Sequence, residues 1–160
     1  MYSLTLENLK PFLLGGKSDF IIRNKTNNNH LNYSIKLNHN KSSQKQETIP
    51  NEKLIYYVYF KSTQKEYIGT IISSITLHNT KPLKSIVFYP TNKSSILDKP
   101  DITKQINTFT LFFDFIFNKN KIPNNVEVLY TGECCKCGKK LTDPKYIERG
   151  IGAWCSGEKF

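Results

Sequence analysis

All four cysteines of this chain lie near its end, at positions 134, 135, 137 and 155 of 160 residues. The residues before them contain no disulfide framework, so they have to fold by burying apolar side chains. A hydrophobic content of 38% and an aromatic content of 12% are sufficient for such a core. Four cysteines gathered in one short segment are typical of metal binding rather than of a secreted disulfide framework.

Short runs rich in isoleucine, tyrosine, valine and phenylalanine alternate with polar turns between residues 18 and 90. This pattern predicts strands, and their spacing favours an antiparallel meander over parallel strands with crossover helices. Residues 38–52 are polar and predict a loop within the meander. A further run at residues 125–130 predicts a strand that leads directly into the cysteines.

Residues 101–118 contain neither glycine nor proline and predict one long helix, with Asp101 as its N-cap. Apolar residues recur at helical spacing and predict a face that packs on the sheet. This face comprises Ile102, Ile106, Phe109, Phe113 and Ile116, and it is widened by Phe112, Phe115 and Phe117. The sequence therefore predicts an α+β fold, with a domain over residues 1–130 and a zinc-binding knuckle over residues 131–160.

The segment Cys134-Cys135-Lys136-Cys137-Gly138 contains a C-x-x-C pair followed by glycine. In a zinc knuckle two thiolates approach one ion from a tight turn, and the glycine permits the positive φ that the turn requires. Cys155 follows at a separation typical of the second half of such a site. The spacing predicts Zn²⁺ bound by Cys134, Cys137 and Cys155.

Other uses of these cysteines fit the pattern less well. A redox C-x-x-C pair normally begins a helix in a βαβ unit, whereas this pair follows a predicted strand. A nucleophilic cysteine needs a base, and the last quarter of the chain contains no histidine. An iron–sulfur cluster that uses all four cysteines stays open as a minor alternative.

The fourth ligand of the predicted zinc ion is left open by the sequence. Cys135 and Glu158 are the nearest candidates, because one adjoins Cys134 and the other follows Cys155 by three residues. Water is a further candidate. His30, His39 and His78 lie in predicted loops or strands of the sheet, where an ordinary surface histidine is the simpler interpretation.

The chain carries 23 lysine and arginine residues against 13 acidic residues, a formal net charge of +10. Such a charge favours phosphate backbones or acidic protein surfaces as partners. Lysine dominates over arginine, and asparagine runs such as residues 27–29 are frequent, so a biased coding background explains the same charge without a partner. Both interpretations remain open at this point.

Around the cysteines, basic and aromatic side chains are interleaved. Lysine and arginine neutralise phosphates, and an aromatic ring stacks on an exposed base, so this pattern predicts nucleic-acid binding. The alternative is a protein-directed inhibitor of a host defence complex, with a host protein or nucleoprotein complex as its partner. The candidate binding residues are Lys136, Lys139, Lys140, Lys145, Tyr146, Arg149 and Trp154.

Several functional classes are disfavoured. The acidic residues are scattered, and the phosphate-binding, dinucleotide-binding, zinc-protease and serine-hydrolase motifs do not occur, so we expect binding rather than catalysis. The longest apolar run is shorter than the roughly 18 residues of a membrane span, and the first residues lack the basic start and long apolar block expected of a signal peptide. The sequence therefore predicts a cytoplasmic protein.

The C-terminal signature resembles one shared by a family of uncharacterised proteins common in phages and mobile elements. Its pattern is C-x-x-C-G-[RK]-x-L-T-x-P-x-S-I-x-x-G-I-G-P-x-C, and it aligns with residues 134–155. This chain departs from the pattern at Tyr146, where the family has serine, and at Ala153, where it has proline. The resemblance implies zinc binding and, for a phage protein, the cytoplasm of a host cell, but it brings no known activity.

Overall fold

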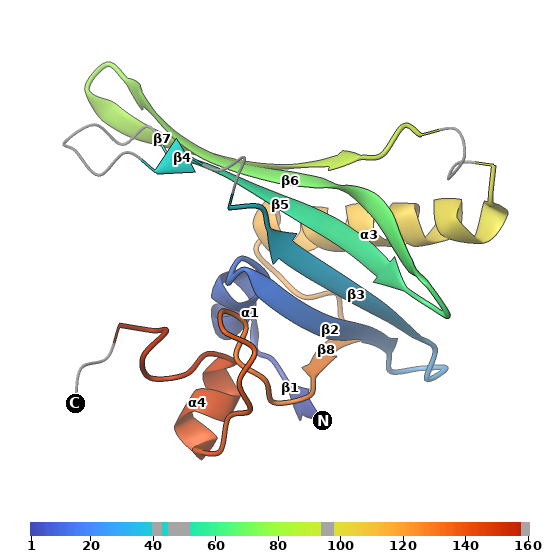
Figure 1. Cartoon of the computed structure of the whole chain (residues 1–160). Helices are drawn as coiled ribbons and strands as arrows, with labels where there is room; N and C mark the ends of the chain where they lie inside the picture. Colours follow the sequence, from blue (N-terminus) through green and yellow to red (C-terminus); the bar gives the residue numbers. More distant parts are fainter. Residues whose placement is uncertain (40–42, 45–51, 94–97, 158–160) are drawn as a thin grey trace.

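The computed structural model describes residues 1–39, 43–44, 52–93 and 98–157, which form an antiparallel sheet with helices (Figure 1). Along the sheet the strand order is β1-β8-β2-β3-β5-β6-β7, and β4 pairs with β5 beside this path. The strands are β1 (Tyr2–Ser3), β2 (Lys17–Asn24), β3 (His30–Leu37), β4 (Ser43–Gln44), β5 (Glu52–Lys61), β6 (Lys65–His78), β7 (Lys81–Pro90) and β8 (Val126–Tyr130). The helices are α1 (Leu6–Leu13), α3 (Pro100–Phe117) and α4 (Pro144–Arg149). The predicted α+β class, with an antiparallel sheet and one long helix, is confirmed.

Strands β2, β3, β5, β6 and β7 pair in chain order, as a meander does, and each run predicted between residues 18 and 90 falls within one of them. The chain then crosses through α3 and returns as β8, which pairs with β2 and places Val128 opposite Ile22. On its other side β8 pairs with β1, where Tyr130 lies opposite Tyr2. The segment that follows β8 therefore begins beside the N-terminus.

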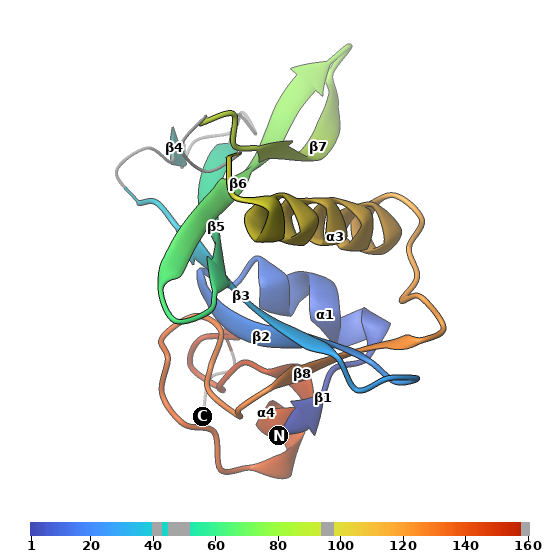
Figure 2. The ribbon, with the colours of Figure 1, turned by 90° about the vertical axis from the view of Figure 1, so that its right-hand side faces the viewer.

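Helices α1 and α3 lie on the same side of the sheet (Figure 2). Side chains alternate along each strand, so one set faces these helices and the other faces away. In β2, Phe20 and Ile22 are buried beneath the helices, whereas Lys17 and Asp19 are exposed on the opposite face. We call the side that faces the helices the inner face and the other side the outer face.

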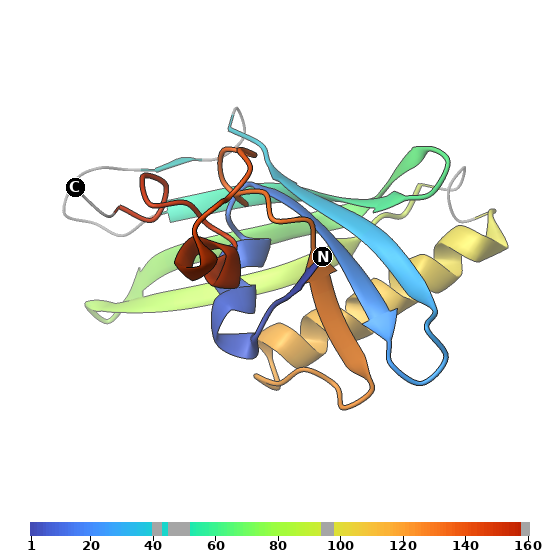
Figure 3. The ribbon, with the colours of Figure 1, turned by 90° about the horizontal axis from the view of Figure 1, so that it is seen from below.

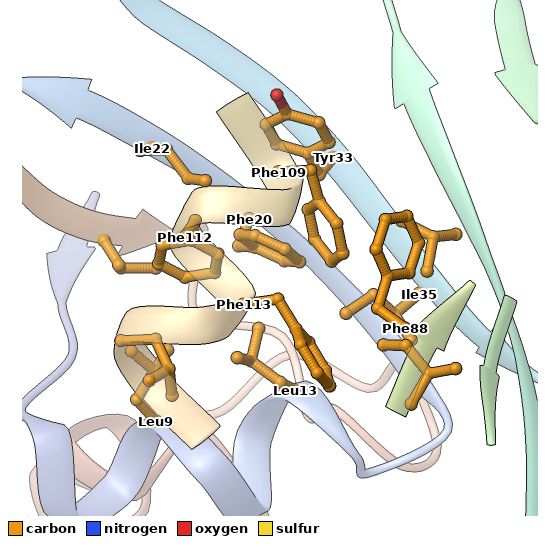
Figure 4. Close-up of a cluster of buried hydrophobic side chains, with 14 of the residues drawn as sticks. Leu9, Leu13, Phe20, Ile22, Tyr33, Ile35, Phe88, Phe109, Phe112 and Phe113 are labelled. Carbon is orange, nitrogen blue, oxygen red and sulfur yellow. The ribbon is translucent and has the colours of Figure 1, made fainter. Parts of the chain in front are cut away.

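Helix α3 supplies the largest aromatic contribution to the core (Figure 4). The predicted apolar face is buried, together with Phe112, whereas Phe115 and Phe117 are only partly buried. Phe109 packs against Tyr33 of β3 and Phe88 of β7, with ring centroids 5.3 and 4.8 Å apart. The helix therefore joins the middle of the sheet to its far edge.

The predicted N-cap of this helix was wrong by two residues. Lys99 is the N-cap and Pro100 occupies the first turn, where a missing N–H costs nothing because that donor would have no partner in the helix. Asp101 lies inside the first turn, where its carboxylate faces the positive end of the helix dipole. The predicted end was correct, since Asn118 is the C-cap.

Helix α1 was missed, because the first hundred residues were interpreted as strands. It spans eight residues and contains Pro11, which is unusual inside a helix. Its buried residues Leu9, Phe12 and Leu13 close one end of the inner face.

The predicted polar loop at residues 38–52 is only partly described. Its described residues are 38–39, the strand β4 and residue 52, and the other positions lie outside the described residues. No helix in the described part of the chain is long and apolar enough to cross a membrane.

Candidate metal centre

The first half of the cysteine segment is a tight loop that continues from β8. The N–H of Leu141 donates to the carbonyl oxygen of Gly132 at 2.8 Å. Next to this hydrogen bond, the backbones of Glu133 and Lys140 form an isolated antiparallel β-bridge. Inside this pairing, the N–H of Cys134 donates to the carbonyl oxygen of Lys139 at 2.8 Å. The N–H of Gly138 donates to the carbonyl oxygen of Cys134 at 2.9 Å. Gly138 has a φ of 79°, the positive value predicted for this position. We call residues 132–141 the knuckle loop.

The second half turns back through α4. Asp143 caps this helix by accepting a hydrogen bond of 2.9 Å from the N–H of Lys145, and Pro144 occupies its first turn. Gly150 ends it with a φ of 73°, the left-handed conformation that glycine adopts without a steric cost. The short helix reverses the chain and returns Cys155 to the knuckle loop.

Three thiols meet where these halves approach each other. The Sγ atoms of Cys134, Cys137 and Cys155 all lie within 4.8 Å of one another. Thiolates that share one tetrahedral zinc ion, with Zn–S distances of about 2.3 Å, lie roughly 3.8 Å apart, so small side-chain rotations bring all three within bonding range. The three cysteines predicted as ligands therefore form a group that could hold a metal ion such as zinc.

The surroundings of Cys134 favour its thiolate form. Burial alone raises its pKa, but hydrogen bonds from the backbone N–H groups of Cys137, Gly152 and Lys136 outweigh burial and lower that pKa to about 7. The donors Lys136 and Gly152 lie 3.5 and 3.4 Å from its Sγ atom. Sequence reasoning missed Gly152 as a donor. The available signal was the glycine pair at positions 150 and 152 of the C-terminal signature.

Cys155 has the opposite tendency while no cation is present. Burial raises its pKa to about 11, reinforced by hydrogen bonds with the thiols of Cys137 and Cys134. Two or three neighbouring thiols resist becoming thiolates together, because their negative charges repel. A divalent cation removes this repulsion and binds the deprotonated sulfurs, so metal binding at this group releases protons.

Cys135 is not part of the group, and its candidacy as fourth ligand does not fit the structure. It is 1% exposed and belongs to the hydrophobic core, where it contacts Gly15 at the end of α1. Burial raises the pKa of its thiol to about 12. Its N–H donates to the carbonyl oxygen of Gly150 at 2.9 Å, and its own carbonyl accepts from Lys17. Neighbouring cysteines point to opposite sides of the chain, one to the metal group and one to the core.

The other candidates for a fourth ligand are placed as follows. Glu158 lies outside the described residues. His30 is exposed at the start of β3, and His39 is exposed two residues beyond its end. His78, whose side chain is not described, ends β6. Within the described part of the chain, the group of ligand-type side chains contains only the three cysteines.

The C-terminal segment packs against the body of the protein rather than extending from it (Figure 3). The hydroxyl of Tyr130 donates to the carbonyl oxygen of Ile147 in α4, and the Tyr130 ring packs edge-on against Phe12 at 5.0 Å. A β-carbon on Gly150 would lie 2.5 Å from the Phe12 ring, so only glycine fits this contact. The segment that carries the three clustered thiols therefore packs on the same hydrophobic core as the sheet.

The predicted binding residues lie on the surface of this segment. Lys136, Lys139 and Lys140 are exposed on the knuckle loop, and Lys145 is exposed on α4. Tyr146 and Arg149 are half-buried on α4. Trp154, next to Cys155, is 81% exposed. All seven belong to the segment that also contains the three clustered thiols.

In comparisons with protein families, with curated proteins and with solved structures, nothing matches this chain. The likeness of residues 134–155 to a phage and mobile-element signature therefore stays a prediction carried by those residues alone.

Proposed function

We propose that this is a small zinc-stabilised protein that acts by binding nucleic acid rather than by catalysis. The observation that carries the proposal is the exposure of Lys136, Lys139 and Lys140 on a loop that also supplies two of the three clustered thiols. Zinc bound at this group fixes the loop and presents the lysines together. Clustered lysines bind phosphates by releasing the counterions around them.

Trp154 gives the same surface an aromatic element. An exposed indole beside basic side chains stacks on an unpaired base or packs on a sugar, with a contribution of about 1–3 kcal/mol per stacked base. The formal charge of +10 supports the same partner by attracting it over a longer range. The phage-like signature at residues 134–155 agrees with a protein that meets nucleic acid in a host cell.

A binding titration tests this proposal. Zinc-loaded protein is titrated into labelled single-stranded and duplex DNA and RNA, and fluorescence anisotropy is followed at several salt concentrations. We expect an affinity that falls steeply with salt, because each phosphate contact adds about −0.7 to −0.9 to the slope of log K against log salt. Curves that stay flat at low salt would show that the positive charge is not used for nucleic acid.

Charge reversal at the knuckle loop locates the surface. Lys139→Glu with Lys140→Glu should abolish most of the binding, because it replaces two attractive charges with two repulsive ones. Lys119→Glu with Lys121→Glu is the matched control, since these two exposed lysines follow α3 and contact Phe115. The change in net charge is the same in both variants. Equal losses in both would assign the effect to overall charge and not to the knuckle loop.

A protein partner is the second candidate, and one observation favours it. Strand β7 pairs only with β6 along the described sheet path, and it exposes Leu83, Val87 and Tyr89 to solvent. Exposed apolar side chains on an edge strand are a common docking surface for another chain. A host protein bound in this way should co-purify in a fixed ratio after nuclease treatment, as expected of an inhibitor of a host defence complex.

A further inference from the structure

Three tyrosines gather on the outer face of the sheet. Tyr57 and Tyr59 alternate with the buried residues Tyr56 and Val58 along β5, and Tyr67 lies on β6 opposite Tyr59. The Tyr67 ring centroid is 5.8 Å from that of Tyr57 and 6.1 Å from that of Tyr59, in edge-to-face contacts. We call these three half-buried rings the tyrosine face. It makes no contribution to the buried core on the inner side.

Lysines surround the tyrosine face. The Nζ atom of Lys65 lies 4.3 Å from the centre of the Tyr59 ring, and that of Lys93 lies 5.6 Å from the centre of the Tyr67 ring. Lys36 is opposite Tyr57 on β3, and Lys61 is opposite Lys65 at the end of the hairpin. We call Lys36, Lys61, Lys65 and Lys93 the lysine rim.

The lysine rim has an excess of positive charge. Burial, followed by a hydrogen bond and charge repulsion from Lys36, lowers the pKa of Lys65. Asp19 opposes this change, and its carboxylate also pairs with Lys61 at 3.3 Å, yet the pKa of Lys65 stays lowered. Lysines brought this close without sufficient compensation are stabilised by an anion that binds among them.

The tyrosine face is also hollowed. Tyr57, Tyr59, Tyr67 and Lys93 line a shallow depression of about 320 Å³. A complementary ligand offers flat rings to the tyrosines and negative charge to the lysines. A single strand of nucleic acid has both, because its base faces are open and its backbone is charged, whereas a duplex hides its base faces within the stack.

We propose that the outer face of the sheet binds single-stranded nucleic acid, with bases stacked on the tyrosine face and phosphates held by the lysine rim. This inference rests on the proposed function and narrows it, because it selects single strands and adds a second surface to the knuckle loop. The sheet supplies a rigid platform, since the rings project from two paired strands. Tyr59 and Tyr67 are each partly exposed, and Lys65 and Lys93 lie over their rings, so stacking and phosphate contacts would be made side by side.

The test compares variants that differ only in stacking ability. Zinc-loaded protein is titrated into labelled oligothymidylate and into a labelled duplex of the same length, with anisotropy as the readout. Tyr59→Leu with Tyr67→Leu should weaken oligothymidylate binding about tenfold or more, because leucine cannot stack on a base. Tyr59→Phe with Tyr67→Phe keeps both rings and should bind within about twofold of the unaltered protein. The duplex should bind more weakly and respond little to either change.

A double substitution of lysines gives an independent measurement if the leucine variant does not fold. Lys65→Gln with Lys93→Gln should weaken binding and reduce the salt slope by about one or more. Lys119→Gln with Lys121→Gln is the matched control, because these lysines also lie over an aromatic ring, Phe115, but on the helix side of the chain. The control should change the salt slope much less.

The outcomes separate this inference from the proposed function. If the unaltered protein binds oligothymidylate and neither the leucine nor the glutamine face variant weakens binding, the tyrosine face is not a binding surface and the inference is overturned. The proposed function then stands, provided that Lys139→Glu with Lys140→Glu abolishes binding. If the unaltered protein binds no nucleic acid even at low salt, both proposals are overturned together.

Discussion

The backbone of Gly15 lies against Cys135 so closely that a β-carbon at position 15 would be 2.8 Å from the Cys135 carbonyl oxygen and would collide with its Sγ atom. This contact joins the end of α1 to the knuckle loop. It turns the Cys135 thiol toward the core, while the adjacent Cys134 faces Cys137 and Cys155. The structure therefore assigns different roles to two neighbouring cysteines.

Replacing Gly15 with alanine should destabilise the protein by about 1–3 kcal/mol, because the added methyl group has to displace the backbone of Cys135. Urea unfolding, followed by circular dichroism, measures this change. Gly16→Ala is an unsuitable control because Gly16 has a φ of 115°. Gly152→Ala is better suited, because a β-carbon there meets its nearest neighbour at an ordinary 3.5 Å. An equal loss in both variants would contradict the account.

Removing the Tyr130 hydroxyl should loosen α4. Tyr130→Phe keeps the ring against Phe12 but leaves the Ile147 carbonyl without this donor, at a cost of about 0.5–1.5 kcal/mol. We expect faster proteolysis within residues 131–157 and little change elsewhere, as measured by limited digestion and mass spectrometry. Tyr2→Phe is the control, since Tyr2 also packs near Tyr130 but is itself partly exposed. Uniform acceleration over the whole chain would argue against a local role.

Chelation should have a local effect as well. If zinc holds the three thiols, a strong chelator should make residues 131–157 sensitive to protease while the sheet and α3 remain resistant. The reason is that the buried cluster beneath the sheet is mainly aromatic and aliphatic, and none of the three clustered thiols belongs to it. Hydrogen exchange with and without chelator measures this difference by segment. Loss of protection throughout the sheet would show that metal and core fold as one unit.

Trp154 should report on the knuckle loop directly. It is the single tryptophan of the chain, it adjoins Cys155, and it is exposed, so we expect its emission to respond to metal and ligand at this surface. We expect quenching when single-stranded DNA is added to the zinc-loaded protein, because an indole stacked on a base loses emission. Binding seen by anisotropy without any change in Trp154 emission would place the nucleic acid away from the knuckle loop.

The parts of the fold that the sequence predicted are those with a local pattern. The strands of the meander and helix α3 have strong two-residue or helical periodicity, which arises from burial on one side. Helix α1 also has apolar residues at helical spacing, Leu9, Phe12 and Leu13, but it spans only eight residues and contains Pro11, which argues against a helix interior. The return of β8 to β2 is a long-range pairing, and residue spacing alone does not specify it.

In the candidate site, too, the features with a local sequence pattern were predicted and the long-range contacts were not. Spacing and the C-terminal signature singled out Cys134, Cys137 and Cys155, because metal ligands within one loop have a characteristic separation. The burial of Cys135 depends on Gly15, more than a hundred residues away, and no local pattern contains that contact. The tyrosine face was missed for a related reason, since residues 57, 59 and 67 were interpreted only as strand formers. Their grouping with lysines from β3 and from the segment after β7 requires the sheet.

The most direct test of the metal centre is the zinc content of three proteins, measured by mass spectrometry after purification under reducing conditions. The unaltered protein and Cys135→Ala should each hold about one zinc ion per chain, because Cys135 lies in the core and not among the clustered thiols. Cys137→Ser should hold almost none, because a serine hydroxyl is a poor zinc ligand. Zinc that is lost from Cys135→Ala but retained by Cys137→Ser, or absent from the unaltered protein, would contradict this account.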